Sequence, residues 1–236
     1  MAAQEGPAWL RLVSEPDGKA GGKLWEGPEE AERSVPPAVP RPRLIGLADW
    51  SADGWDYRAE LYEFVTTPPV SPSPVLRHGV DLPDTWWQGL HQALDRLALV
   101  DTSRQAVREQ YIRRRVPEFT GITPGDITWT TAHGDLHWAN LTGPQLSLMD
   151  WEGWGTAPVG YDVANLYLHS LPVPGLAERV GKEFAHVLGT PVGWVGELTA
   201  CTEILQAAAR VPFYADLADA VRQHLNRLRR AAGSDG

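Results

Sequence analysis

The stretch that decides the fold of this chain is Thr131-Ala-His-Gly-Asp-Leu-His-Trp-Ala-Asn140, continued by Leu141–Glu152. It provides a carboxylate at Asp135, an amide at Asn140 and, after a short predicted hairpin, a second carboxylate at Asp150. Hard oxygen ligands of this kind suit a hard cation such as Mg²⁺, which keeps its other coordination positions for water and phosphate. The pattern therefore predicts a site that holds a metal-bound phosphate.

This stretch also has the spacing of a kinase catalytic loop, H-x-D-x-x-x-x-N, at His133, Asp135 and Asn140. Together with Asp150-Trp-Glu152 and Gly160-Tyr-Asp162-Val-Ala164, it resembles the aminoglycoside phosphotransferases and small-molecule kinases, which share the protein-kinase fold. The resemblance is tightest over residues 132–166. It implies an α+β, two-lobed fold, with a small antiparallel β amino-terminal lobe and a mainly helical carboxy-terminal lobe.

The resemblance implies chemical roles for three residues. Asp135 would orient and deprotonate a substrate hydroxyl for attack on the γ-phosphate of a nucleoside triphosphate. Asn140 and Asp150 would be the ligands of Mg²⁺. The intact set argues against an inactive, nucleotide-binding scaffold, which is the main alternative.

Four further residues of the motif are assigned supporting or open roles. His133 is interpreted as a brace for the catalytic loop, and Asp162 as its buried anchor. His137 and Glu152 lie next to the catalytic residues in the sequence, and each could either touch substrate or metal or hold the loop in shape.

The amino-terminal part is expected to bind the nucleotide. Trp9–Ser14 and Lys23–Trp25 read as two strands of a hairpin around the glycine-rich tip Gly18–Gly22, whose backbone N–H groups could contact phosphate oxygens. Residues 27–33 read as a short acidic helix with a proline near its start. Only one hairpin precedes this helix, so the lobe is reduced in comparison with that of a full kinase.

The order of strand, lysine and acidic helix implies the kinase pair of a phosphate-binding lysine and a glutamate. Lys23 is the candidate for the lysine, although Lys19 lies close enough to compete and Lys23 could be a solvated surface residue. Glu32, or alternatively Glu29, is the candidate for the glutamate.

The nucleotide base has candidate partners in the next part of the chain. Glu63 and Val65 fall where kinase-like folds pass between the lobes, so their backbone would meet an adenine ring; an ordinary strand end is the alternative.

The predicted division of the chain is a reduced nucleotide-binding lobe (1–65), a linker rich in Pro and Ser (66–81) and a helical lobe (82–236). Apolar spacing predicts the helices of the last part. They cover residues 86–97, 103–115, 161–170, 176–188, 195–209 and 217–230.

Composition narrows the range of partners. A formal net charge of −9 argues against nonspecific nucleic-acid binding, which needs a basic surface. The single Cys201 excludes an intramolecular disulfide, and no apolar run approaches the ~18 residues of a membrane span. We expect a cytoplasmic protein with no nucleic-acid or membrane partner; the sequence does not specify a protein partner.

These features are typical of a phosphotransferase that uses Mg²⁺ with ATP or GTP and acts on a hydroxyl of a small molecule. An acidic chain with 11 Trp residues is compatible with an aminoglycoside-like antibiotic or another cationic metabolite as the acceptor. A metal-dependent phosphoesterase is disfavoured because Trp138 replaces the glycine expected after its GDxH motif. A protein kinase is disfavoured because only nine residues separate Asp150 from Gly160, which leaves little room to dock a peptide.

Overall fold

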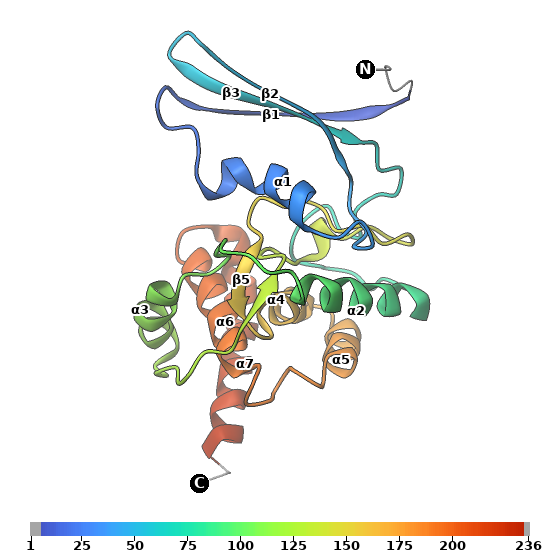
Figure 1. Cartoon of the computed structure of the whole chain (residues 1–236). Coiled ribbons are helices and arrows are strands. Elements are labelled where there is room, and N and C mark those ends of the chain that lie inside the picture. Colours follow the sequence, from blue (N-terminus) through green and yellow to red (C-terminus); the bar gives the residue numbers. More distant parts are fainter. Residues whose placement is uncertain (1–5, 234–236) are drawn as a thin grey trace.

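The computed structural model describes residues 6–233, which form a β-sheet lobe stacked on a helical lobe (Figure 1). Strands β1 (Ala8–Pro16), β2 (Leu44–Ala52) and β3 (Trp55–Glu63) make one antiparallel sheet in the order β1-β3-β2. Helix α1 (Lys23–Ser34) lies between this sheet and the helical lobe. The predicted small antiparallel amino-terminal lobe is confirmed.

Strand β3 is central because it pairs along its length with both neighbours. The turn between β2 and β3 is Asp53-Gly54, where both residues have positive φ angles, 53° and 79°. Such a turn matches the twist of the two strands that it joins. On the other side of β3, β1 places Arg11 directly opposite Glu60.

The predicted hairpin of residues 9–25 is wrong. After β1 the chain turns at Asp17, whose N–H donates to the Gly54 carbonyl (2.9 Å), and α1 begins at Lys23. The carboxylate of Glu26 accepts a hydrogen bond from the Gly22 N–H (3.2 Å), at the helix N-terminus where negative charge is stabilising. Because β1 takes β3 as its partner, residues 23–25 are free to enter the helix.

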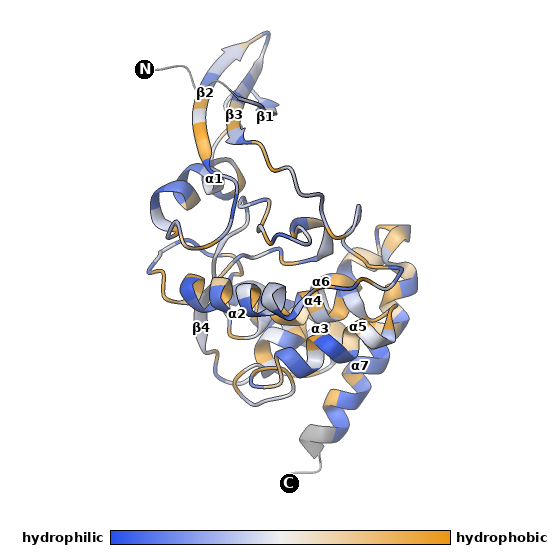
Figure 2. Ribbon diagram, turned by 90° about the vertical axis from the view of Figure 1, so that its right-hand side faces the viewer, coloured by the Kyte–Doolittle hydropathy of each residue, from blue (hydrophilic) through white to orange (hydrophobic). Residues whose placement is uncertain are grey.

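The second lobe is mainly helical, as predicted. Its helices are α2 (Asp84–Ala98), α3 (Glu109–Thr120), α4 (Tyr161–Ser170), α5 (Pro174–Glu183), α6 (Trp194–Ala208) and α7 (Ala215–Gly233). A two-stranded antiparallel ladder of β4 (Trp129–Ala132) and β5 (Gly155–Pro158) and two short 3₁₀ helices, Trp138–Asn140 and Pro212–Tyr214, complete it. Helix α6 is apolar around most of its circumference (Figure 2) and packs against α3, α4 and α7.

Helix α3 begins six residues later than its predicted start at Ser103. The intervening segment runs beside β5 instead, where the Thr156 N–H donates to the Arg104 carbonyl (2.8 Å) and the Val107 N–H donates to the Thr156 carbonyl (3.0 Å). These strand-like hydrogen bonds replace the helical ones, so tertiary pairing overrides the local helical pattern.

The segment assigned as a linker, residues 66–81, packs against the helical lobe. Its Val70 N–H donates to the Leu141 carbonyl (2.7 Å), and its Leu76, which is fully buried, donates to the His169 carbonyl (3.1 Å). Because these partners follow the motif of residues 131–140 or lie in α4, the segment supports residues 133–140, the predicted catalytic loop, from one side.

Buried tryptophans support the same loop from another side. Trp138 stacks on Trp86 of α2, with the ring centroids 6.2 Å apart, and its indole N–H donates to the Ser170 hydroxyl (2.9 Å). The indole N–H of Trp86 donates to the Thr142 carbonyl (2.8 Å). Among residues 6–233, no helix is both long enough and apolar enough to cross a membrane.

Candidate active site

The catalytic motif begins where β4 ends and is fixed by Asp162 at the start of α4. One carboxylate oxygen of Asp162 accepts the His133 N–H (2.6 Å) and the other accepts the Gly134 N–H (3.0 Å). Gly134 has a φ of 86°, and a Cβ at this position would overlap the Gly153 backbone. Burial raises the pKa of Asp162, whereas His133 and the two N–H groups lower it. The Asp162 carboxylate therefore ties the loop that carries Asp135 to the helical core.

Replacing Asp162 with Ala should lower the free energy of unfolding by about 2–6 kcal/mol, because two buried N–H groups lose their acceptor at ~1–3 kcal/mol each. The matched variant Asp162→Asn keeps one acceptor oxygen and should lose less. Chemical denaturation measures both. Equal stability of wild type and Asp162→Ala would contradict the anchoring role.

His133 is fully buried and contacts the segment that carries Asp150. Its Nε2 lies 2.8 Å from the Met149 carbonyl oxygen, to which it donates, and its ring packs edge-on against Trp151 at 4.8 Å between centroids. These contacts join the two halves of the motif across the hairpin, which is what a bracing residue requires.

Asp135, His137 and Asn140 form one hydrogen-bonded group. The Asn140 amide donates to the Asp135 carbonyl (2.9 Å) and carboxylate (3.1 Å), and His137 Nε2 lies 3.4 Å from the same carboxylate. Burial raises the pKa of Asp135, but His137, together with His133 and His169, outweighs this effect, so the pKa lies below its ordinary value. The Asp135 side chain remains about half exposed (53%), so an ionised carboxylate faces solvent at this position.

Asp150 and Asn140 line a cavity of about 240 Å³ between the sheet and the catalytic loop. The sheet contributes Trp9, Arg11 and Tyr62 to its wall. Asp150 has a φ of 62°, an uncommon conformation for a residue other than glycine that recurs at functional sites. The two predicted metal ligands therefore share one cavity with a guanidinium group.

Arg11 is the residue that the sequence analysis missed. One of its nitrogens lies 3.1 Å from a Glu60 carboxylate oxygen, and another forms an ion pair with Glu152. The only signal in the sequence is a cation at an alternating position of the first strand. The position of Arg11 at the cavity depends on the pairing of β1 with β3, which the sequence pattern did not predict.

The structure does not pair Lys23 with Glu32. The Lys23 ammonium donates to the Ala106 carbonyl (2.6 Å), away from the cavity lined by Asp150. Glu32 pairs with Arg41 (2.5 Å) and with Arg43. Burial raises the pKa of Glu32, but hydrogen bonds from these two arginines bring it to about 2. Glu32 thus fastens α1 to the start of β2.

The residues predicted to meet the adenine ring also lie outside this cavity. Glu63 is the last residue of β3, and its N–H already donates to the Arg43 carbonyl (2.9 Å). Neither Glu63 nor Val65 lines the cavity, whereas Tyr62 and Pro69, on either side of them in the sequence, do. The glycine-rich segment 18–22 contributes no residue to the cavity wall either.

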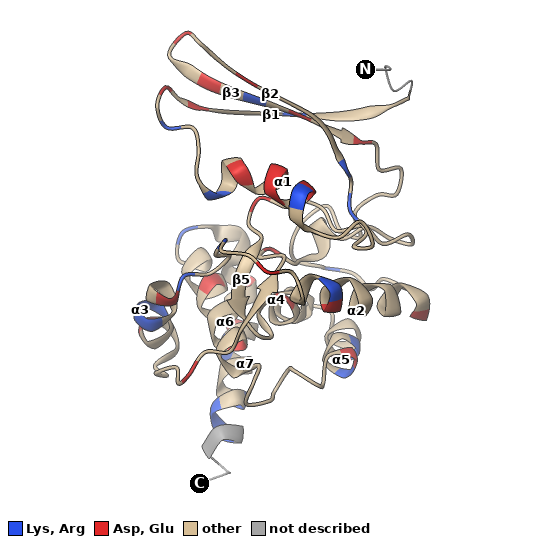
Figure 3. Ribbon diagram, viewed as in Figure 1, with Lys and Arg blue, Asp and Glu red and all other residues tan. Residues whose placement is uncertain are grey.

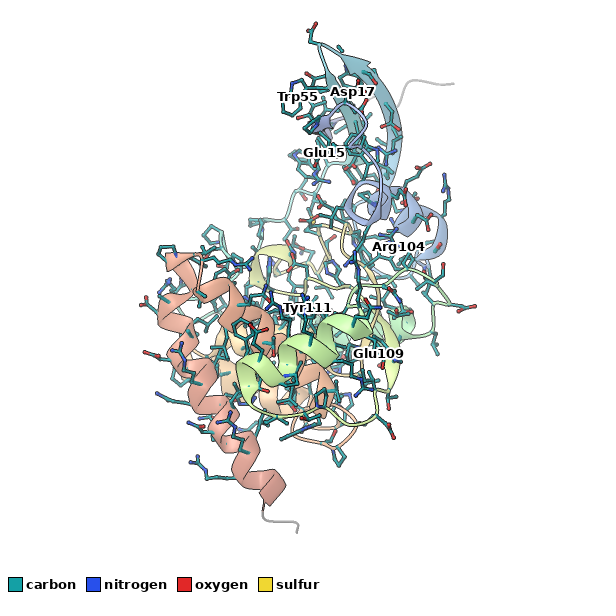
Figure 4. All side chains as sticks on the ribbon, turned by 90° about the vertical axis from the view of Figure 1, so that its left-hand side faces the viewer. Glu15, Asp17, Trp55, Arg104, Glu109 and Tyr111 are labelled. Atoms are coloured by element: carbon teal, nitrogen blue, oxygen red, sulfur yellow. The ribbon has the colours of Figure 1, made fainter. Side chains whose placement is uncertain are left out.

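Helix α1 docks directly onto the segment that follows Asp150. The Trp154 indole N–H donates to the Gly27 carbonyl (2.9 Å), and the Arg104 guanidinium bridges the carbonyls of Lys23 (2.8 Å) and Glu152 (3.3 Å). Figure 4 shows Arg104 between α1 and the helical lobe. The glycine at position 27 is required for this approach, because a Cβ there would lie 2.8 Å from the Glu152 Cα.

Comparison with solved structures defines the class of fold. A thermostable mutant of aminoglycoside phosphotransferase APH(4)-Ia, in a ternary complex with ADP and hygromycin B, matches with a TM-score of 0.62 and 13% identity over 95% of this chain and 86% of that one. Amicoumacin kinase hAmiN, in complex with AMP-PNP, Ca²⁺ and Ami, matches with a TM-score of 0.55 and 11% identity over 92% of this chain and 81% of that one.

A microcompartment-associated aminopropanol kinase matches with a TM-score of 0.52 and 13% identity over 95% of this chain and 86% of that one. No protein-family model and no curated protein matches the sequence. The chain has the two-lobed fold of the aminoglycoside phosphotransferases and small-molecule kinases, as the motif resemblance predicted.

Proposed function

We propose that this protein is a small-molecule kinase that transfers the γ-phosphoryl group of a nucleoside triphosphate to a hydroxyl group. The observation that carries the proposal is the cavity in which Asn140, Asp150 and Arg11 meet, beside the exposed carboxylate of Asp135. A carboxylate, an amide oxygen and a cation around one space can hold a metal-bound triphosphate, and Asp135 can accept the proton of the attacking hydroxyl.

The chemistry of the two ligands fits Mg²⁺. Asn140 uses its amide nitrogen in its side-chain hydrogen bonds, which leaves its oxygen for a cation, and Asp150 forms no ion pair with another described residue. Over residues 6–233, no group of three or more His, Cys, Asp or Glu side chains is arranged as a metal site. Two oxygen ligands, from Asn140 and Asp150, suit Mg²⁺, which keeps its other coordination positions for water and phosphate. Bound Mg²⁺ would neutralise charge on the phosphate groups.

Arg11 takes the place proposed from the sequence for Lys23 as the phosphate-binding cation. It lines the cavity, and each of its two terminal nitrogens, which pair with Glu60 and Glu152, has a second N–H group that can donate to a phosphate oxygen. The ion pairs with Glu60 and Glu152 hold it there without a nucleotide. Tyr62 and Trp9 provide aromatic surface in the same wall, where an adenine or guanine ring could stack. A cytoplasmic location, where ATP and GTP are supplied, fits this function.

Thermal unfolding with Mg²⁺ and ATP, GTP or no nucleotide tests the proposal. A ligand at ~100 times its dissociation constant adds ~2.7 kcal/mol to the free energy of unfolding, which raises the Tm of a chain of this size by roughly 5–10 °C. We expect a shift of this size that requires Mg²⁺. The absence of a shift with both nucleotides would contradict the proposal, and it would also contradict the alternative of an inactive, nucleotide-binding scaffold.

Arg11→Ala should weaken nucleotide binding about tenfold or more, because charge-assisted hydrogen bonds to phosphate are lost. Arg33→Ala is the matched control, since the exposed Arg33 lies on α1 of the same lobe and pairs with Glu29, and neither residue lines the cavity. Titration of the Tm with MgATP measures both affinities. Equal affinity of the Arg11 variant and wild type would return the phosphate-binding role to Lys23.

A further inference from the structure

A second cavity, of about 510 Å³, opens beside the catalytic loop. Its wall consists of Ala106, Val107, Arg108, Gln110, Tyr111, Arg114 and Glu203. Ala106 connects this cavity to the candidate base, because a Cβ added to Gly134, the residue before Asp135, would lie 3.1 Å from the Ala106 Cβ. The Ala106 carbonyl also accepts the Lys23 ammonium, so Lys23 lies at the edge of the cavity.

The far wall of this cavity is held by contacts between α3 and α6. The Tyr111 hydroxyl donates to the Gln206 side-chain oxygen (2.9 Å), and Figure 4 shows Tyr111 on α3. On the α6 side, the Glu203 carboxylate accepts the hydroxyl hydrogen of the buried Tyr161. Four of the seven wall residues therefore lie on helices α3 and α6, and the other three, Ala106, Val107 and Arg108, lie in the segment that runs beside β5.

Three cations surround this space without a carboxylate partner. Arg108 and Arg114 line it and, within residues 6–233, form no ion pair, and the ammonium of Lys23 is bound to a carbonyl. The other acidic and basic side chains of α3 pair with each other, in the ion pairs Glu109–Arg113 and Glu118–Arg115. Figure 3 shows basic residues on α3, at the flank of the helical lobe.

One carboxylate in the wall offsets this charge only in part. Burial raises the pKa of Glu203 to about 7, although Tyr161 and Lys23 lower it, so this carboxyl group offsets at most one positive charge. Lys23, Arg108 and Arg114 contribute three positive charges around the same space. The cavity is therefore net positive, although the chain as a whole carries −9.

We propose that the phosphate acceptor carries an anionic group, a carboxylate or a phosphate, which Arg108 and Arg114 bind while its hydroxyl reaches Asp135. This inference rests on the proposed kinase function. Arginine is suited to this task because its planar fork matches the oxygens of carboxylate and phosphate. An acceptor with only positive charge, as the acidic composition suggested, would meet like charges in this cavity.

The reaction balances with the residues in these roles. The acceptor oxygen forms a bond to the γ-phosphorus, and the bond between that phosphorus and the bridging oxygen breaks. The electron pair of the broken bond leaves with the nucleoside diphosphate, and the hydroxyl proton passes to Asp135. The anionic group of the acceptor stays on the arginines throughout, so it orients the hydroxyl without taking part in bond making.

The test uses inorganic phosphate and glucuronate as probes, at saturating MgADP so that the nucleotide site is filled. Affinities are measured by thermal unfolding for the wild type, the double variant Arg108→Ala/Arg114→Ala, and two controls. Arg11→Ala reports on the nucleotide cavity, and Arg222→Ala removes an exposed arginine of α7. We expect at least one probe to bind the wild type and both controls, and to bind the double variant about tenfold more weakly or worse.

No shift of the wild type with either probe, or an equal shift in the double variant, overturns the inference. So does a shift that is lost in Arg11→Ala and kept in the double variant, because the anion would then occupy the nucleotide cavity. A Tm shift with glucuronate alone would identify the anionic group of the acceptor as a carboxylate. A Tm shift with phosphate alone would identify it as a phosphate group. The Tm shift with MgATP is measured separately. A shift with MgATP but with neither anion would overturn this inference and would still support the proposed kinase function.

Turnover of matched sugars then extends the test to catalysis. Glucose, glucosamine, glucuronate and glucose 6-phosphate share hydroxyl groups and differ in charge. With MgATP, we expect phosphorylation of an anionic member to exceed that of glucose and glucosamine by about tenfold or more, from the same arginine contacts. Preferential phosphorylation of glucosamine would overturn the inference in favour of a cationic acceptor.

Discussion

Asp135→Ala should bind MgATP as the wild type does and lose phosphoryl transfer by a factor of about 10²–10⁴, the usual contribution of a positioned general base. The expectation follows from the geometry of the loop. The Asp135 carboxylate is half exposed beside the cavity wall, while Asn140 keeps its second contact, to the Asp135 backbone carbonyl, in the variant. The proposed metal ligands should therefore stay in place when the side chain is removed.

Two measurements decide this prediction. The Tm shift with MgATP reports binding, and transfer of labelled γ-phosphate to the preferred acceptor reports chemistry. Asp219→Asn is the matched control because it removes a carboxylate that is exposed on α7. Unchanged transfer by Asp135→Ala would remove Asp135 from the mechanism, and loss of MgATP binding would give it a structural role in the nucleotide site instead.

Gly27→Ala is expected to have the largest effect on the docking of the two lobes. In an ordinary helix interior this change stabilises by roughly 0.5–1 kcal/mol. At Gly27 the added Cβ would overlap the Glu152 backbone, and the neighbouring Trp154 hydrogen bond leaves the helix no room to shift. Overpacking of this kind costs about 1–3 kcal/mol, so we expect net destabilisation.

The same substitution should also weaken MgATP binding, because Glu152 holds Arg11 and follows Asp150 by two residues. Gly181→Ala is the matched control in α5, where an added Cβ would lie 3.7 Å from the Tyr167 ring, an ordinary contact. Chemical denaturation and MgATP titration compare the two variants. If Gly27→Ala were as stable as Gly181→Ala and bound MgATP equally well, α1 would not be docked as described.

The features that sequence predicted well are local ones. The helical pattern placed α4 at residues 161–170, and α2 and α6 within one or two residues of their observed ends. The motif residues Asp135, Asn140 and Asp150 follow one another in a short stretch. Their spacing was therefore enough to predict a kinase-like site without knowledge of tertiary contacts. Those residues still have proposed roles, which the variants above test.

The features that sequence predicted poorly depend on partners far away in the chain. The assignment of Lys23 to a strand failed because β1 pairs with β3, some fifty residues later, rather than with residues 23–25. The same pairing brings Arg11 to Glu60, and the docking of α1 brings it to Glu152. No local periodicity encodes which of several strands will be the partner.

The sequence alone therefore determined the kinase-like motif and most of the helices, because each depends on the types and spacing of residues that are close in the chain, and the resemblance of the motif implied the two-lobed fold. The tertiary structure alone decided that Arg11 lines the cavity of Asn140 and Asp150, that Arg108 and Arg114 line a second cavity, and that Lys23 contacts its wall at Ala106. A cation acquires such a position from the strand register and helix packing around it. Those depend on the burial of apolar surface across the whole domain, which no short stretch of sequence expresses.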